Sequence, residues 1–378
     1  MSDGILFTAD QHTGLATHDG PTLDGRPSWR QVEAESVADI VQHTASQREA
    51  YTICAGDFYN SRKPPAWAYA VEADYPGGFA ILGNHDAFES RDKVPPLSVA
   101  RELQPVRTPT VTLLGAYAVV FIPWFGRSLV AREGGMSVAE QFARMETALA
   151  AIVTQKVAEA RALSEHVLVV AHLTVAGAEY NSGTQPMLGE ASEFMVPAHV
   201  LAQPGVEAVY LGHVHKPQTF YSGDIPITYI GSAIRHDFGD EANVCRALYV
   251  EPGKPVEEIE LPATRFVTVP VESQAVVSVP NTVDGAVVRF KGELPAGMES
   301  AARLARLREE ALAMGALKVA KPAVRFVRHD VRREHEFRID ASPTDTLRRY
   351  FELAGGEYAE RTEPLVALHG SLMEGGTE

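Results

Sequence analysis

The sequence is poor in cysteine and lacks long apolar runs. Its two cysteines, Cys54 and Cys245, are too few for a disulfide framework or for a metal site built on thiolates. No apolar run approaches the roughly 18 residues of a membrane span, and residues 1–10 lack the basic start and apolar core of a signal peptide. We therefore expect a cytoplasmic protein, without a membrane partner, in which any metal ion is held by oxygen and nitrogen atoms.

The sequence is also short of positive charge. Its 34 Lys and Arg face 49 Asp and Glu, which gives a formal net charge of −15. Taken as a whole, this balance argues against a polyanionic partner such as DNA. The charge is uneven, however, because residues 287–340 hold 12 Lys and Arg against 8 Asp and Glu. The net charge alone therefore does not exclude a nucleic-acid partner.

The 378 residues are 45% hydrophobic and 22% charged, enough for a large domain with an added module. Short apolar runs alternate with segments of helical spacing, which predicts a layered α/β sandwich of buried strands and covering helices. The runs lie at residues 5–7, 51–54, 79–82, 119–122, 167–170 and 206–211. Shorter strands are expected at 227–230, 247–250 and 259–261.

The pattern changes near residue 265, and we expect three domains: 1–265, 266–340 and 341–378. The second reads as strand, helix and strand at 286–290, 298–314 and 323–327, which indicates a small α+β module. The third begins with Ser342-Pro343-Thr344-Asp345, a strong helix-start signal, and a second helix is expected at 364–373. The two helices carry an apolar stripe that must be covered by this chain or by a partner. It consists of Leu347, Tyr350, Phe351, Leu365, Leu368 and Leu372.

Five of the apolar runs end in polar residues that can bind metal ions. These ends read Asp10-Gln11-His12, Gly56-Asp57, Gly83-Asn84-His85-Asp86, His172 and Gly212-His213-Val214-His215. Ligands of open α/β sheets gather beyond the carboxyl ends of the strands, so we expect these residues to converge on one site.

The spacing and the donor set indicate a pair of metal ions. Asp10 and His12 lie two residues apart, as do His213 and His215, so each pair projects to one side of an extended segment. Carboxylates, imidazoles and an amide without thiolates suit Mn²⁺, although Mg²⁺, Fe²⁺, Zn²⁺ and Co²⁺ also fit. Seven such ligands exceed the needs of one ion, whereas two ions sharing a carboxylate would use them all and would clamp a phosphate.

Each of these motifs alone has an ordinary structural explanation, such as a turn or a satisfied polar residue after a strand. Their number and order favour function. The remaining eight histidines lack such a setting, and we expect them to be surface or structural residues. They are His18, His43, His166, His199, His236, His329, His335 and His369.

The five motifs, in this order, resemble those of the calcineurin-like metallophosphoesterases over residues 5–217. The stretch Tyr229-Ile230-Gly231-Ser232-Ala233-Ile234-Arg235-His236-Asp237-Phe238-Gly239-Asp240-Glu241 then resembles the segment that follows Gly-His-x-His in SbcD-type nucleases. The resemblance implies an α/β fold: a four-layered αββα sandwich, a small α+β capping domain and C-terminal helices. It also implies a dinuclear site.

The resemblance further implies roles for single residues. Asp10, His12 and His215 correspond to ligands of one metal ion, Asn84, His172 and His213 to ligands of the other, and Asp57 to the bridging carboxylate. His85 corresponds to the catalytic histidine, which Asp86 could orient. This chain departs from the pattern at Asn60, where SbcD-type enzymes often carry His or Asp.

The implied activity is that of the nuclease component of an SbcCD-like DNA repair and recombination complex. Such proteins act as 3′→5′ exonucleases on duplex ends and as endonucleases on hairpins, and they pair with an SbcC-type coiled-coil ATPase. The C-terminal helices would dock on that ATPase, with packing onto the capping module as the alternative. DNA would contact Arg235, Arg303, Arg306, Arg325 and Arg328.

The resemblance also implies a homodimer, within a heterotetramer, built from helices that follow the second and third motifs. Here these would lie at 65–74, with Trp67, Tyr69 and Val71, and at 96–103, with Leu97, Val99 and Leu103. Ordinary core packing explains the same apolar residues equally well.

Two other functions remain open at this point. The same core could serve a phosphodiesterase that acts on a nucleotide or another small molecule. A catalytically idle scaffold for DNA or the ATPase is the third candidate, against which the complete ligand set argues.

Overall fold

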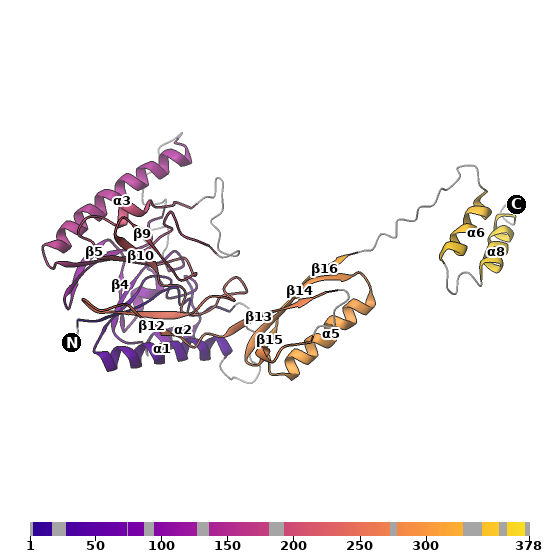
Figure 1. The fold of residues 1–378 in the computed structure, drawn as a ribbon, viewed down its shortest axis with the longest axis horizontal. Coiled ribbons are helices and arrows are strands. Elements are labelled where there is room, and N and C mark those ends of the chain that lie inside the picture. The colour runs from indigo at the N-terminus through magenta and orange to yellow at the C-terminus, as the bar shows by residue number, and fades with distance from the viewer. Residues whose placement is uncertain are drawn as a thin grey trace. The chain divides into compact units, whose positions relative to one another are not determined.

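The structure is a computed structural model that describes residues 3–16, 28–73, 75–86, 94–126, 136–180, 193–272, 278–327, 342–354 and 361–374. The chain divides into two compact units, Met1–Phe326 and Val327–Glu378. The first unit holds both the sandwich and the α+β module (Figure 1). The domain boundaries near residues 265 and 340 therefore stay predictions from the sequence.

Two six-stranded sheets form the centre of the first unit. The first has the order β12-β11-β1-β2-β3-β4, with parallel pairing from β1 to β4 and antiparallel pairing of β11 and β12 at one edge. Its strands are β1 (Ile5–Thr8), β2 (Tyr51–Cys54), β3 (Gly78–Ile81), β4 (Leu103–Val106), β11 (Arg246–Val250) and β12 (Glu257–Glu260).

The second sheet has the order β5-β6-β7-β8-β10-β9, with parallel strands from β6 to β10 and antiparallel strands at both edges. Its strands are β5 (Thr110–Leu114), β6 (Tyr117–Ile122), β7 (His166–His172), β8 (Ala208–Gly212), β9 (Gln218–Ser222) and β10 (Ile225–Tyr229). The parallel strands of both sheets therefore end at a common edge.

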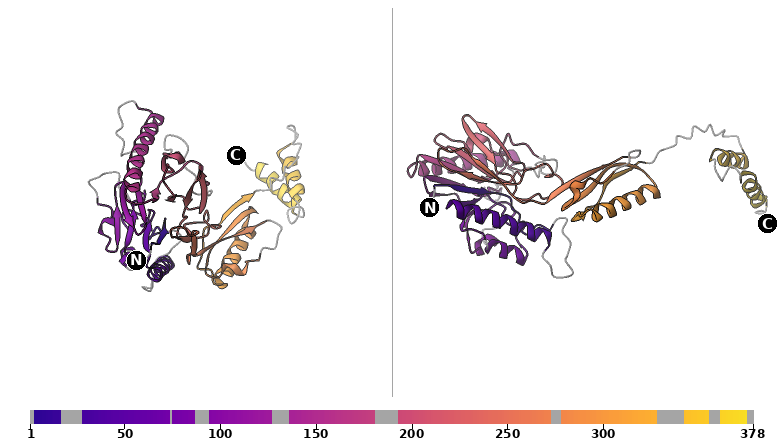
Figure 2. Two further views of the ribbon diagram at one scale, coloured as in Figure 1. Left: turned by 60° about the vertical axis from the view of Figure 1, so that its left-hand side comes forward. Right: turned by 60° about the horizontal axis from the view of Figure 1, so that its bottom comes forward.

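The two sheets pack face to face, and helices cover their outer faces. Ile5 and Phe7 of β1 join Phe121 of β6 and Val170 of β7 in the core between the sheets. The outer face of the first sheet packs on α1 (Trp29–Arg48) and α2 (Ala66–Ala73), and that of the second on α3 (Val138–Arg161) and α4 (Ala198–Leu201) (Figure 2). This arrangement is a four-layered αββα sandwich, as predicted.

Side-chain alternation explains how β1 serves both faces. Ile5 and Phe7 point to the inner core, whereas Leu6 packs in the cluster that includes Val37 and Val41 of α1.

Helix α3 begins at a capping box, in which the Ser137 hydroxyl accepts the Glu140 N–H while the Glu140 carboxylate accepts the Ser137 N–H.

The α+β module follows the sandwich. Strands β13 (Arg265–Val271), β14 (Ala286–Pro295) and β15 (Lys318–Val319) pair in parallel, and β16 (Ala323–Val327) also pairs with β14. Helix α5 (Met298–Ala313) buries Leu304, Leu307 and Ala311 in the module's own core. The module thus has the strand, helix and strand order that the sequence predicts.

The second unit contains α6 (Pro343–Ala354) and α8 (Thr362–Glu374), which pack against each other. Arg348 of α6 donates from Nε to Glu363 of α8 at 2.8 Å, and Val366 is buried. Both predicted C-terminal helices are therefore present.

One predicted helix is wrong. Residues 96–103 contain only the 3-10 turn η1 (Pro96–Val99), after which the chain enters β4. The physical reason is anchoring by Glu72 of α2, whose carboxylate accepts the N–H groups of Arg101, Glu102 and Leu103 and so fixes the extended chain.

The apolar residues of the two segments proposed for a dimer mostly serve the core. Val71, Leu97 and Leu103 are buried, and Trp67 and Tyr69 pack against the same cluster. Val99, with 62% of its surface exposed, is the exception.

Among the described residues, none of the helices has the length and apolar character needed to cross a bilayer.

Candidate dinuclear metal centre

The predicted ligands meet at the common edge where the parallel strands of both sheets end. Asp10 and His12 follow β1, Asp57 follows β2 and Asn84 follows β3, while the second sheet supplies residues from β7 and β8. His172 closes β7, and His213 and His215 come directly after β8.

The backbone is strained at several of these positions. Among the described non-glycine residues, a positive φ occurs at Asp10 (49°), His12 (45°), Asp57 (51°), His213 (91°) and, away from the site, Glu49 (51°). L residues rarely adopt such angles, and strained backbone concentrates where side chains must be aimed at a functional site. Four predicted ligands are thus held in a conformation that the fold must enforce.

Two glycines allow the close approach of these loops. A Cβ atom at Gly56 would lie 2.2 Å from His172 Nδ1, and one at Gly83 would lie 2.0 Å from Asp57 Oδ1. Both distances are impossible for real atoms, so any larger residue would push the ligands apart.

Asp57 lies at the centre of the site. One carboxylate oxygen is 3.3 Å from His172 Nε2 and 3.6 Å from His12 Nε2, and the other accepts the backbone N–H of His85 at 2.8 Å. A carboxylate between two imidazoles from different sheets has the position required of a bridging ligand.

On one side of Asp57, the imidazole nitrogens are oriented for metal binding. His172 Nδ1 lies 2.8 Å from the Ala55 carbonyl oxygen, so its Nε2 faces Asn84 Oδ1 at 3.1 Å. His213 Nδ1 lies 3.0 Å from the same amide oxygen, and its Nε2 lies 2.7 Å from Glu193. The contacts with Ala55 and Glu193 hold the rings from outside, and they leave His172 Nε2 and His213 Nδ1 for an ion.

On the other side, His12 Nδ1 lies 3.2 Å from Asn60 Oδ1, which leaves Nε2 directed toward Asp57. His12 Nε2 is buried and has no hydrogen-bond partner among the described residues, as is also true of His215 Nδ1. Such unsatisfied buried nitrogens are costly unless an ion or water binds them. His215 Nδ1 lies 3.4 Å from Asp240.

The donor atoms fall into groups that could each hold one ion. In each group, one ligand atom per residue lies within 4.8 Å of the others: Asp57 with His172 and His213, His12 with Asp57 and His85, and His12 with His215 and His236. The residues therefore fit two divalent ions sharing Asp57. Asp10 belongs to none of these groups, and its carboxylate accepts the His213 N–H at 2.9 and 3.0 Å.

Burial and neighbouring charges perturb the protonation of the site. Burial alone would raise the pKa of Asp57, but His172 and His12 hold it well below its usual value. Burial alone would lower the pKa of His172, but the Asp57 and Asp10 carboxylates raise it to about 9. Burial lowers the pKa of His12 well below its ordinary value. The metal-free site thus holds a proton on His172 at neutral pH.

His85 and Asp86 have different surroundings. His85 is exposed, and its Nδ1 lies 2.8 Å from the Asn60 carbonyl oxygen, which leaves Nε2 for a substrate. Asp86 is buried and accepts the N–H groups of Phe58, Tyr59 and Gly83, so in the structure it holds two ligand loops together. Burial and the Asp57 charge raise the pKa of Asp86 to about 8.

The arginines predicted to contact DNA make different contacts in the structure. Arg235 donates to the carbonyl oxygens of Asn243, Ala263 and Thr264, which joins its loop to the start of β13. The others belong to the α+β module. Arg306 is exposed on α5, Arg303 donates to the Glu272 carbonyl, Arg325 is paired with Glu293 at 3.4 Å, and Arg328 lies outside the described residues.

The C-terminal apolar residues are partly accessible. Tyr350 is 43% exposed and Leu368 is 57% exposed, while Leu347, Phe351 and Leu365 are half-buried. The side chain of Leu372 lies outside the described residues.

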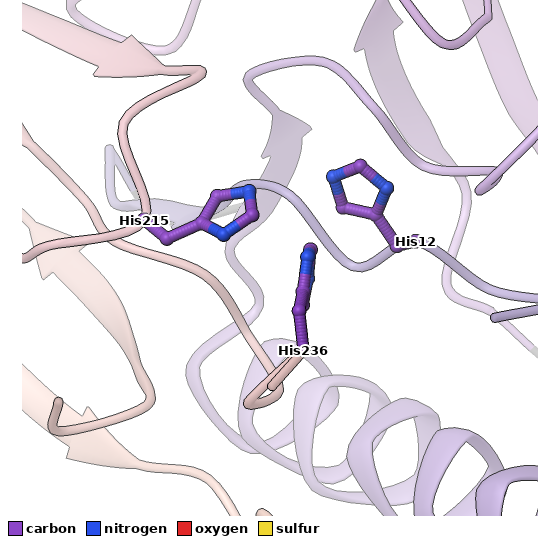
Figure 3. Close-up of side chains that lie close together, drawn as sticks. All are labelled: His12, His215 and His236. Atoms are coloured by element: carbon purple, nitrogen blue, oxygen red, sulfur yellow. The ribbon is translucent and has the colours of Figure 1, made fainter. Parts of the chain in front are cut away.

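The sequence prediction missed three residues that contact predicted ligands. His236, expected to be a surface or structural residue, joins the cluster formed by His12 and His215 (Figure 3). Asp240 lies beside His215, and Glu193 beside His213. His236 and Asp240 fall inside the recognised 229–241 stretch, which was the available signal, whereas no pattern marked Glu193.

Known proteins with similar sequences support a phosphoesterase site. The calcineurin-like phosphoesterase family matches residues 4–217. The SbcD component of the nuclease SbcCD from Rhodobacter capsulatus is 26% identical over 313 residues, covering 68% of this chain and 71% of the relative. Its namesake from Bacillus subtilis is 25% identical over 282 residues, covering 67% of each chain.

Among solved structures, a dimetal phosphatase from Danio rerio is 13% identical, with a TM-score of 0.40, and the match covers 68% of this chain and 98% of that one. The resemblance to SbcD-type metallophosphoesterases is confirmed by the two curated relatives. With the family match spanning more than half of the sequence and the ligands assembled at one edge of the sandwich, the chain belongs to the calcineurin-like phosphoesterases.

Proposed function

We propose that the protein is a DNA nuclease that depends on two divalent metal ions and acts as the SbcD-type component of an SbcCD-like complex in the cytoplasm. The observation that carries the proposal is the position of Asp57, which lies between His172 on one side and His12 on the other. The similarity to two proteins named as the SbcD component of the nuclease SbcCD supports DNA as the substrate.

Bound ions would supply an activated water molecule and would neutralise charge on the phosphate oxygens. Asp10, His12, Asp57 and His215 would hold one ion. Asp57, Asn84, His172 and His213 would hold the other. Mn²⁺ is the proposed ion, since it accepts both carboxylate and imidazole ligands.

His85 is the proposed catalytic residue. The Asn60 carbonyl holds its Nδ1 at 2.8 Å, and the ring is exposed, so Nε2 can donate to a phosphate oxygen or to the leaving 3′ oxygen. Asn60 thereby serves both His12 and His85 without itself carrying a titratable group. Asp86 positions His85 indirectly, by fixing the loop of residues 83–86.

DNA would reach beyond the metal centre to the basic α+β module. Arg306 is exposed there, Arg303 donates to the Glu272 carbonyl, and Arg325 donates to the Glu293 carboxylate. We propose that these three arginines neutralise phosphates of the duplex. The proposed activities are 3′→5′ exonuclease action at duplex ends and endonuclease action on hairpins.

The C-terminal unit is the proposed docking site for an SbcC-type ATPase. Tyr350 and Leu368 leave apolar surface exposed on α6 and α8. A homodimer within a heterotetramer remains part of the proposal, but most apolar residues of the two segments first expected to form it are used by the core.

The first prediction concerns the reaction itself. Purified protein with Mn²⁺ should degrade linear duplex DNA, and His85→Ala should slow cleavage by about 100- to 10,000-fold because a proton donor is lost. Mn²⁺ binding, measured by calorimetry, should persist in this variant. His166→Ala, which removes a histidine paired with Glu207 away from the centre, is the matched control and should cleave normally.

Three other outcomes would contradict the proposal. Turnover of bis-p-nitrophenyl phosphate without DNA cleavage, with or without the ATPase, would indicate a small-molecule phosphodiesterase. Failure to turn over either substrate would indicate a scaffold. Wild-type cleavage by His85→Ala would remove His85 from the reaction.

The second prediction concerns pH. The pKa of His172 is about 9 in the metal-free protein, so its imidazole carries a proton below pH 9. A metal ion that binds below this pH must displace that proton. Mn²⁺ affinity should therefore rise by up to about tenfold for each pH unit between 7 and 9 and level off above that range. Calorimetry in buffers of different ionisation enthalpy should detect the released proton. Affinity that stays constant from pH 7 to 9, without proton release, would refute this protonation state.

The third prediction concerns the partner. Deletion of residues 342–378 should leave Mn²⁺-dependent nuclease activity intact and should abolish co-purification with the SbcC-type ATPase. Leu368→Ala should weaken the association because it removes exposed apolar surface, whereas Arg349→Ala, which removes an exposed charged side chain of α6, should not. Full association after the deletion would exclude this unit as the docking site.

A further inference from the structure

His236 lies among the metal ligands although it belongs to none of the five ligand motifs. Its ring centre is 3.9 Å from that of His215 and 4.2 Å from that of His12, in both cases with the rings nearly edge to face. Figure 3 shows the three imidazoles converging, with His215 on the left, His12 on the right and His236 below. One nitrogen from each ring lies within 4.8 Å of the other two.

The position of His236 is fixed from outside the site. Arg30 of α1 is buried and donates to the carbonyl oxygens of Arg235 and His236 at 2.8 and 3.0 Å. Asp240 accepts the His236 N–H at 3.1 Å. The backbone that carries the ring is thus held by charged groups that are themselves buried, which is the support that a precisely aimed ligand needs.

The direct hydrogen bonding of the His236 ring is weak. Its Nε2 lies 3.4 Å from the carbonyl oxygen of Asp10, close to the limit of a hydrogen bond. Among the described residues, this long contact is the ring's only hydrogen bond, and the ring lies beside His12 and His215. Both of these neighbours have a buried nitrogen without a hydrogen-bond partner among the residues that the structure describes.

We propose that His236 is an additional ligand of the metal ion held by His12 and His215. The inference rests on the proposed dinuclear centre and adds a third imidazole to one of its two sites. Because imidazole favours ions such as Fe²⁺, Co²⁺ and Zn²⁺ over Mg²⁺, His236 would make this site more selective than its neighbour, which has two imidazoles.

The test uses Co²⁺ as the probe, with the full-length, metal-free protein. Calorimetry should give two Co²⁺ per wild-type chain. In His236→Ala, one of the two affinities should fall by at least about tenfold, the lower end of the loss when a supporting residue of a metal site is removed. The visible absorption of that Co²⁺ should change because its ligand set changes, while the other ion binds as before.

His236→Gln separates a ligand from a merely structural residue and serves where the alanine variant fails to fold. Its side-chain amide can still donate to the Asp10 carbonyl, so a structural role predicts wild-type Co²⁺ binding and absorption. The proposal predicts that one site is weakened and that the discrimination between Co²⁺ and Mg²⁺ at that site shrinks. His43→Gln, at an exposed position of α1, is the control and should bind both ions normally.

The outcomes distinguish this inference from the proposed function. Two Co²⁺ bound to His236→Gln with wild-type affinity and absorption would overturn the role of His236 and leave the dinuclear centre standing. Wild-type protein that binds fewer than two Co²⁺ would overturn the dinuclear centre, and the role of His236 with it.

Discussion

The site depends on one buried carboxylate. Asp57 is almost inaccessible to water, and a charge in that position is tolerable only with compensating groups around it. The fold supplies them from both sheets: His172 from the second, and the loop that carries His12 from the first. Strained backbone at four predicted ligands and a glycine facing Asp57 follow from the same need for close approach. Two cations beside this carboxylate would complete the compensation.

Much of the sandwich follows directly from sequence pattern. Runs such as 119–122 and 167–170 are apolar on both faces, so their burial between a second sheet and helix α3 could be predicted. Strand β9 could not be predicted, because its residues are only partly buried. The 3-10 turn η1 could not be predicted either, because its geometry depends on the distant carboxylate of Glu72. The ligand motifs were predictable because each follows a recognisable strand. The 229–241 stretch contains His236, but its place beside the ligands could not be predicted, because Arg30, more than 200 positions away, fixes that place.

The segment from residue 235 to 241 joins the metal centre to the α+β module. His236 lies at the ligands, Arg235 donates to carbonyl oxygens just before β13, and Glu241 accepts the N–H of Thr268 within it at 2.7 Å. Basic residues of the module and the metal ligands are therefore linked by a short, well-bonded stretch. The net charge of −15 is therefore compatible with the proposed DNA substrate, because the basic module and the cations would make the contacts with phosphates.

The central claim is that Asp57 bridges two divalent ions. Anomalous X-ray scattering at the manganese absorption edge, from crystals grown with Mn²⁺, tests it most directly. The account predicts two peaks, one on the His172 side and one on the His12 side of Asp57, with a carboxylate oxygen bound to each. A single peak, or a pair in which Asp57 touches only one ion, would contradict it.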